Sequence, residues 1–111
     1  MAETFNNASV KLTGTNATDL YQAPTSAAAD RAIVLSCLVA NVSSSNVGIT
    51  IALTDGSNSV LSTLASTITV PADAALEIIS NKVILKQSQK LRATASDANT
   101  LHLTVSALEI T

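Results

Sequence analysis

Apolar and polar residues alternate with a two-residue period along most of this chain, and this period is typical of β-strands that have one buried face. In the segment 47–54 the apolar positions are Val47, Ile49, Ile51 and Leu53. Asp55 and Gly56 follow this segment, and both residue types favour turns. The pattern predicts a half-buried strand that ends in a tight turn.

Similar runs recur along the chain, separated by residues that favour turns. Strands are expected near residues 5–12, 19–22, 32–40, 47–54, 60–70, 75–80, 82–86, 90–96 and 101–110. About eight or nine short strands predict an all-β fold, an antiparallel β-sandwich of the Ig-like or jelly-roll-like kind. A single domain of residues 1–111 is expected from the length. The alanine-rich segment 25–32 has helical propensity, but a loop before the next strand is the favoured interpretation.

The segment 32–40 departs from the one-sided pattern, because both sets of alternate positions are apolar. One set is Ile33, Leu35, Cys37 and Val39, and the other is Val34, Leu38 and Ala40. A strand in a sandwich has only one inner face. We expect the set that contains Leu35 to face the core, so Val34 and Leu38 need cover from outside the sandwich.

The last predicted strand changes phase near its end. Its first apolar positions, which share one parity, are Leu101, Leu103, Val105 and Ala107. Leu108 and Ile110 fall on the other parity. Three explanations remain open: a β-bulge near Ala107 that returns both side chains to the core, contact with a neighbouring subunit, or cover by a loop of the same chain.

The bulge is the local explanation, but it does not account for the second apolar set of the segment 32–40. Contact with another subunit accounts for both departures. The predicted oligomer or partner contact therefore consists of Val34, Leu38, Leu108 and Ile110.

The composition excludes several classes of function. Hydrophobic residues make up 47% of the chain, charged residues 13%, and the formal net charge is −2. Nucleic-acid binding needs a basic surface, so no nucleic-acid partner is expected. Four basic residues lie in one region of the sequence: Lys82, Lys86, Lys90 and Arg92. We expect them to form a solvated rim that balances Glu77 and Asp73.

The N-terminal segment lacks the basic start and apolar core of a signal peptide, and no apolar segment approaches the length of a membrane span. Synthesis in a cytoplasm and no membrane partner are therefore expected. Cys37 is the only cysteine and lies within the apolar run AIVLSCLVA. We expect a buried and unreactive thiol, because no basic neighbour lowers its pKa.

Residues with catalytic or metal-binding chemistry are few. His102 is the only histidine, and a metal site needs several ligands at suitable spacing. The acidic segments 54–58 and 96–99 lack the alternating oxygen ligands and the closing Glu of a calcium loop, so a role in turns is favoured. The chain contains no GxSxG, GxGxxG or P-loop sequence. We expect no enzyme activity, no metal and no cofactor.

Four segments carry a family resemblance: LYQAP, AIVLSCLVANVSSSNVGITIALTD, STLASTITVPADAALEIISNKVILKQSQKLRATAS and LHLTVSALEI. Together they resemble the short β-sandwich virion proteins of tailed bacteriophages. In that group a long apolar strand ends in VAN, a TVPA turn follows, and a strand of the form V-S-x-L-E-I closes the chain. The similarity runs from about residue 20 to residue 110.

The resemblance implies an architectural function. It implies a capsid decoration (cement) protein of the virion, made in the host cytoplasm, that self-associates as a homotrimer and clamps major capsid subunits. A neck, tail or fibre component is the alternative within the virion. A surface carbohydrate-binding module is a further alternative, disfavoured because aromatic residues, on which sugar rings stack, make up only 2% of the chain.

Overall fold

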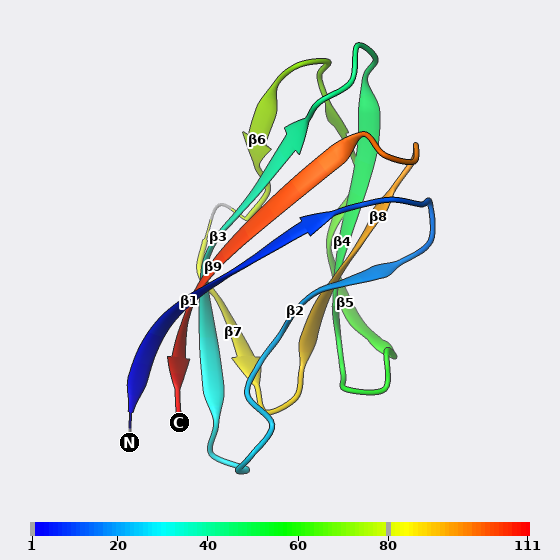
Figure 1. The fold of residues 1–111 in the computed structure, drawn as a ribbon. Helices are drawn as coiled ribbons and strands as arrows, with labels where there is room; N and C mark the ends of the chain where they lie inside the picture. Colours follow the sequence, from blue (N-terminus) through cyan, green and yellow to red (C-terminus); the bar gives the residue numbers. More distant parts are fainter. Residues whose placement is uncertain (1, 80) are drawn as a thin grey trace.

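The computed structural model describes residues 2–79 and 81–111 and arranges them in two antiparallel β-sheets that lie face to face (Figure 1). Its strands are β1 (Glu3–Lys11), β2 (Thr18–Gln22), β3 (Arg31–Asn41), β4 (Val47–Thr54), β5 (Val60–Val70), β6 (Ala75–Glu77), β7 (Val83–Lys86), β8 (Lys90–Ala95) and β9 (Leu101–Ile110). The described residues contain no helix, and the predicted all-β sandwich is confirmed. Ser80, the last residue of the strand predicted at 75–80, lies outside the described residues.

The two sheets differ in how their edges are formed. Sheet A has the strand order β1-β9-β3, and β6 and β7 pair one after the other with the far edge of β3. Sheet B has the order β2-β8-β4-β5. Backbone hydrogen bonds join Ala2 and Thr111 in both directions, at 3.1 and 2.9 Å. The first and last residues that the structure describes therefore lie side by side at one end of the sandwich (Figure 1).

The inward positions of both sheets form one apolar core. Its largest fully buried side chains are Leu12, Val34, Val39, Val47, Ile49, Ile51, Val70, Leu85, Leu91, Leu101, Leu103 and Val105. All of them are aliphatic, so burial of apolar area supplies most of the driving force for folding. Asn41 is a buried polar exception, and its Nδ2 donates hydrogen bonds to the carbonyl oxygens of Ser45 and Val70.

A β-bulge in β3 explains why both sets of alternate positions in this strand are apolar. Opposite β9, Val34 pairs with Ala107 and Ser36 pairs with Ser106, which leaves Leu35 as an extra residue. The buried residues are Ala32 and Val34 before the bulge, and Cys37, Val39 and Asn41 after it. The bulge therefore exchanges the parity that faces the core.

Two expectations for this strand are wrong as a result. Val34 is 0% exposed and belongs to the core, so it does not lie on an outer face. Leu35 is half-buried and lines a hollow on the surface. Strict alternation assumes an uninterrupted strand, and one extra residue reverses the faces of all residues beyond it.

Of the three explanations for the phase change in the last strand, the structure excludes the β-bulge in β9. β9, whose residues are all described, pairs with β1 without any shift of register. Leu108 and Ile110 therefore remain on the outer face, and Glu109 takes the inner parity between them. The Tyr21 hydroxyl donates a hydrogen bond to the Glu109 carboxylate at 2.6 Å. The core-facing residues of β9 therefore end with Glu109, whose carboxylate has a hydrogen-bond donor in Tyr21.

The segment before β3 forms a loop, as expected. Asp30 is buried, and its carboxylate accepts a hydrogen bond from the backbone N–H of Ala27 at 2.9 Å. The Arg31 guanidinium donates to the carbonyl oxygens of Ala28 and Asp30.

Among the described residues there is no helix of the length and apolarity needed to cross a membrane.

Candidate functional site: the outer face of sheet A

Four large apolar residues form a line across the outer face of sheet A, one from each of four strands. The register places Phe5 of β1 opposite Leu108 of β9, Leu108 opposite Ile33 of β3, and Ile33 opposite Ile84 of β7. Directly opposed residues in antiparallel strands have Cβ atoms about 4.5–5.5 Å apart on the same face. The four side chains therefore form a continuous stripe, which we call the apolar row.

The ends of the apolar row are open to solvent. Phe5 is 77% exposed and Ile84 is 62% exposed. Leu108 and Ile33 lie between them and are half-buried. Most of the apolar area that remains available for a partner is therefore at the two edges of the sheet.

A second line of residues borders the apolar row at the end of the sheet. It consists of Glu3, Ile110, Arg31 and Lys86, in the order of the strands. Ile110 extends the apolar surface by one position, and charged residues surround it. Charged residues thus border the apolar row on one side, as a polar rim borders the apolar core of many protein interfaces.

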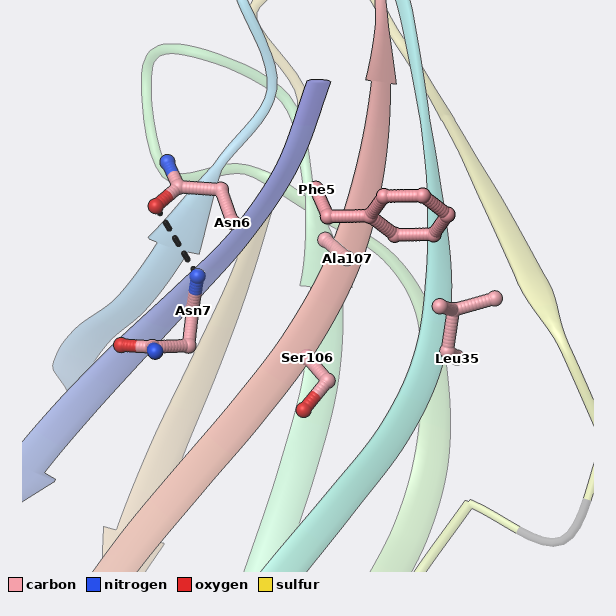
Figure 2. Close-up of a pocket in the computed structure, with 6 residues that line it drawn as sticks. All are labelled: Phe5, Asn6, Asn7, Leu35, Ser106 and Ala107. Carbon is pink, nitrogen blue, oxygen red and sulfur yellow. Dashed lines mark hydrogen bonds between the residues drawn. The ribbon is translucent and has the colours of Figure 1, made fainter. Parts of the chain in front are cut away.

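A hollow of about 370 Å³ adjoins the apolar row on the side of the β3 bulge. Its lining residues are Phe5, Asn6, Asn7, Leu35, Ser106 and Ala107. Figure 2 shows the Phe5 ring extending across β9 toward β3, on the side on which Leu35 lies. The bulge therefore adds a fifth large apolar side chain, Leu35, to this part of the face.

The structure places three of the four predicted contact residues on this outer face. Leu108 belongs to the apolar row, Ile110 lies beside it, and Leu38 lies farther along β3, 43% exposed and opposite Thr104. Val34 is the exception, because it is buried in the core. Contact of the other three with a subunit or partner stays a prediction.

Sequence analysis did not identify Phe5, Ile33 or Ile84 as parts of this face. The pairing of Phe5 with Leu108 joins the two ends of the chain, and such nonlocal register has no local sequence signal. A signal did exist for Ile84, since Val83, Ile84 and Leu85 are consecutive apolar residues and one of them has to face outward.

Sheet B carries an ionic cluster on its outer face, and its exposed large apolar residues, Val60, Leu61 and Ile68, all belong to the edge strand β5. The Asp19 carboxylate lies 3.0 Å from Lys90 Nζ and 2.7 Å from Arg92 Nε. The hydrogen bond from Lys90 is the largest cause that holds the pKa of Asp19 below its usual value, and Arg92 adds to it. We expected Lys90 and Arg92 to balance Glu77 and Asp73, but β8 pairs with β2, which brings Asp19 to them.

The expected burial of Cys37 is confirmed. Burial, and secondarily the Glu77 carboxylate, raises the pKa of this thiol to about 12. The backbone N–H of Cys37 donates a hydrogen bond to Glu77 Oε1 at 2.6 Å. At neutral pH the sulfur is therefore a protonated thiol, which is a poor nucleophile.

His102 and the acidic turns also have structural positions. His102 lies half-buried on the outer face of β9, opposite Lys11 and Ala40. Asp55 Oδ1 accepts backbone N–H bonds from Ser57 and Ser59 at 2.8 and 3.0 Å, so this carboxylate holds a turn. In the stretches 2–79 and 81–111, no group of three or more His, Cys, Asp or Glu residues is arranged to hold a metal ion.

Comparison with known proteins identifies the fold. No family model matches the sequence, and no curated protein matches it significantly. Solved structures do match. The acid-stable capsid structure of Helicobacter pylori bacteriophage KHP30 contains a chain that aligns with a TM-score of 0.60 and 9% identity, over 99% of this chain and 89% of that one.

Two further structures align equally well. A Bacillus endospore appendage, a disulfide-linked pilus, aligns with a TM-score of 0.59 and 11% identity, over 98% of this chain and 88% of that one. A chain of infectious bursal disease virus, Gx strain, aligns with a TM-score of 0.59 and 14% identity over 98% of this chain, which spans only 32% of the viral chain. At such low identity these similarities concern the fold alone.

Proposed function

We propose that this chain is a structural protein of a phage virion, namely a capsid decoration (cement) protein that binds the assembled shell and stabilises it. The observation that carries this proposal is the apolar row on the outer face of sheet A. Large exposed apolar surfaces with a polar border mark interaction sites. In the particle, the apolar row faces the major capsid subunits.

The available apolar area is sufficient for such a contact. Full burial of an exposed apolar side chain contributes about 1.5–3 kcal/mol. Phe5 and Ile84, which are mostly exposed, therefore contribute on the order of 3–6 kcal/mol together when a partner covers them. This contribution is large enough to govern attachment at micromolar concentration.

Stabilisation of the shell follows from linkage. A protein that binds only the assembled shell lowers the free energy of that state by its own binding free energy. No catalytic step is needed, and we assign the chain no enzymatic role. The resemblance of the sequence to phage virion proteins supports this proposal, as does the fold shared with a chain of a phage capsid.

The test uses shells of the encoding phage that were assembled without this protein. Purified wild-type chain is expected to co-sediment with these shells and to raise their melting temperature. The double variant Leu108→Ser with Ile110→Ser is expected to stay folded and to lose binding. The matched control, Ala52→Ser with Thr94→Ser, changes two half-buried positions on the outer face of sheet B and is expected to bind like the wild type.

Circular dichroism of each variant separates loss of binding from loss of folding. Because Leu108 and Ile110 are half-buried, Phe5→Ser serves as a second variant at a side chain that makes little contact within the chain. Binding of both variants at wild-type strength would refute the role of the apolar row. Absence of wild-type binding to shells would refute the decoration function itself.

A neck, tail or fibre component is the second candidate. The shared fold with a pilus protein favours it, because that neighbour belongs to a filament. Quantitative mass spectrometry of purified particles distinguishes the two, since a decoration protein is present in far more copies. The homotrimer implied by the resemblance is the alternative to the dimer inferred below, and sedimentation of the purified chain distinguishes the two.

A further inference from the structure

β1 is an edge strand that lacks the usual protection against pairing with another chain. Natural proteins protect sheet edges with short strands, bulges, prolines or charged residues along the edge. β1 has nine residues, no proline, no positive φ angle and no shift of register against β9. Its charged residues are Glu3 and Lys11, at its two ends.

The other edge strands are protected. β2 has five residues and a register shift, and β6 and β7 have three and four residues. β5 is longer, but its pairing with β4 shifts register at three places. Among the described strands, only β1 therefore combines length with regularity at an edge.

The backbone of β1 shows which groups are free. Ala2 and Leu12, which flank the strand, donate their N–H groups to the carbonyl oxygens of Thr111, which follows β9, and of Leu101, which begins it. Because the direction of backbone groups alternates along a strand, the even-numbered residues of β1 pair with β9. The N–H and C=O groups of the odd-numbered residues point to the open edge.

A local hydrogen bond agrees with this assignment. The N–H of Asn7 donates to its neighbour's side-chain oxygen, Asn6 Oδ1, at 2.9 Å. Figure 2 shows this bond on the side of β1 that faces away from β9. The N–H group of Asn7, at the centre of the open edge, therefore has no backbone acceptor and bonds only to the exposed Asn6 side chain.

We infer that β1 pairs antiparallel with β1 of a second copy of this chain, around a two-fold axis at Asn7. In this register each Glu3 lies opposite Lys11 of the other copy, so the pairing forms two cross-strand ion pairs. Neither residue forms an ion pair with any other described residue. This charge complementarity is the reason for choosing a second copy as the partner.

The same register satisfies the backbone. Five opposed pairs form along the edge, and each exchanges two hydrogen bonds, about ten in total. Residues that are opposed in this way belong to the same face, so the charged ends of both copies meet on the outer face. An isologous contact of this kind closes on itself and gives a dimer.

The inference goes beyond the proposed function, because it uses the edge of sheet A and not its outer face. The two-fold axis runs perpendicular to the sheet, so the apolar rows of both copies lie on the same side of one continuous sheet. A dimer therefore presents two apolar rows to one surface. Both apolar rows of the dimer can then bind to the same region of the shell.

The test measures the mass of the purified chain by sedimentation equilibrium at several concentrations. The chain has a mass of 11.3 kDa, and the wild type is expected to sediment as a dimer. Glu3→Lys and Lys11→Glu each replace two ion pairs by two like-charge contacts. Each is expected to raise the dissociation constant about tenfold or more at low salt.

The double variant Glu3→Lys with Lys11→Glu re-forms both ion pairs with reversed sign and is expected to restore the dimer. A mixture of the two single variants is expected to form a mixed dimer. Thr15→Lys with Ser44→Lys adds the same positive charge at two exposed loop positions outside β1, and it serves as the control for net charge. If the single variants lost the dimer because they were misfolded, the double variant would not restore it.

Asn7→Pro gives an independent measurement. The N–H of Asn7 points away from β9, so proline is tolerated within the chain and removes a donor at the centre of the pairing. The variant is expected to be a folded monomer that keeps the wild-type melting temperature within a few degrees. A wild-type monomer or trimer, or a dimer that none of these changes weakens, would overturn the inference while leaving the shell-binding test unaffected.

Discussion

The two sheets contribute to the same core, but their outer faces differ. Across sheet A the register brings together Phe5, Leu108, Ile33 and Ile84. Across sheet B the corresponding register brings together Asp19, Arg92, Ala52 and Thr63. Folding requires only that the inner faces be apolar. The apolar row of sheet A is therefore not explained by the stability of the isolated chain, whereas the line across sheet B, which contains no large apolar residue, is ordinary solvent-facing surface.

The largest expected effect tests whether the inner and outer positions are correctly assigned. Leu103→Ala is expected to lower the free energy of unfolding by about 2–5 kcal/mol, because Leu103 is fully buried. Leu35→Ala is expected to lower it by less than about 1 kcal/mol, because the bulge turns Leu35 outward. Chemical denaturation of both variants measures the difference. Equal losses would contradict the assignment of the bulge.

The next effect compares the two outer faces directly. Phe5→Ser is expected to weaken shell binding by about 1.5–3 kcal/mol, since it removes one fully covered apolar side chain from the contact. Thr94→Ser on sheet B is expected to leave binding unchanged. Titration of shells with each variant gives the two affinities. Similar losses at both positions would mean that the faces do not differ in function.

A smaller effect is expected for the ionic cluster of sheet B. Asp19→Asn removes both ion pairs, but the Asp19 side chain is 52% exposed, so solvent screening limits the loss of stability to less than about 1 kcal/mol at pH 7. The lowered pKa of Asp19 means that its contribution is present above the usual value of 3.8 and disappears as the pH falls through the lowered value. Thermal melts at pH 7 and pH 2 should show a difference only at pH 7.

The smallest expected effect concerns the shared interior. Cys37 is buried and its pKa is raised to about 12, so reductant is expected to leave the melting temperature unchanged. An alkylating reagent should modify the native protein slowly at pH 8 and rapidly after unfolding. Fast modification of the native protein would show that the interior opens more readily than the packing suggests.

The strands themselves were predictable because alternation is a local property. The segment around Ile49 and Ile51 alternates cleanly and forms β4 as expected. The same reasoning failed at Leu35, because neighbouring apolar residues on both parities leave no sign of which residue is the extra one. The position of the bulge in β3 is set by the pairing with β9, and the local sequence carries no information about that pairing.

The candidate site was predictable only where a phase change was visible. Leu108 and Ile110 were identified because they break the alternation of their own strand. Phe5 was not, because its importance depends on lying opposite Leu108, more than a hundred positions away in the sequence. Long-range register is set by the packing of the whole sandwich, and no short window of sequence specifies it.

The bulge at Leu35 has a consequence for insertions and deletions. In a central strand, loss of one residue normally turns every following side chain to the wrong face. Loss of Leu35 would instead join Val34 directly to Ser36, and the shortened strand would alternate regularly, with Val34 and Cys37 both inward. β3 therefore behaves as a regular strand that contains a one-residue insertion. This position is where a central strand of the protein can change its length by one residue and keep every other side chain on its present face.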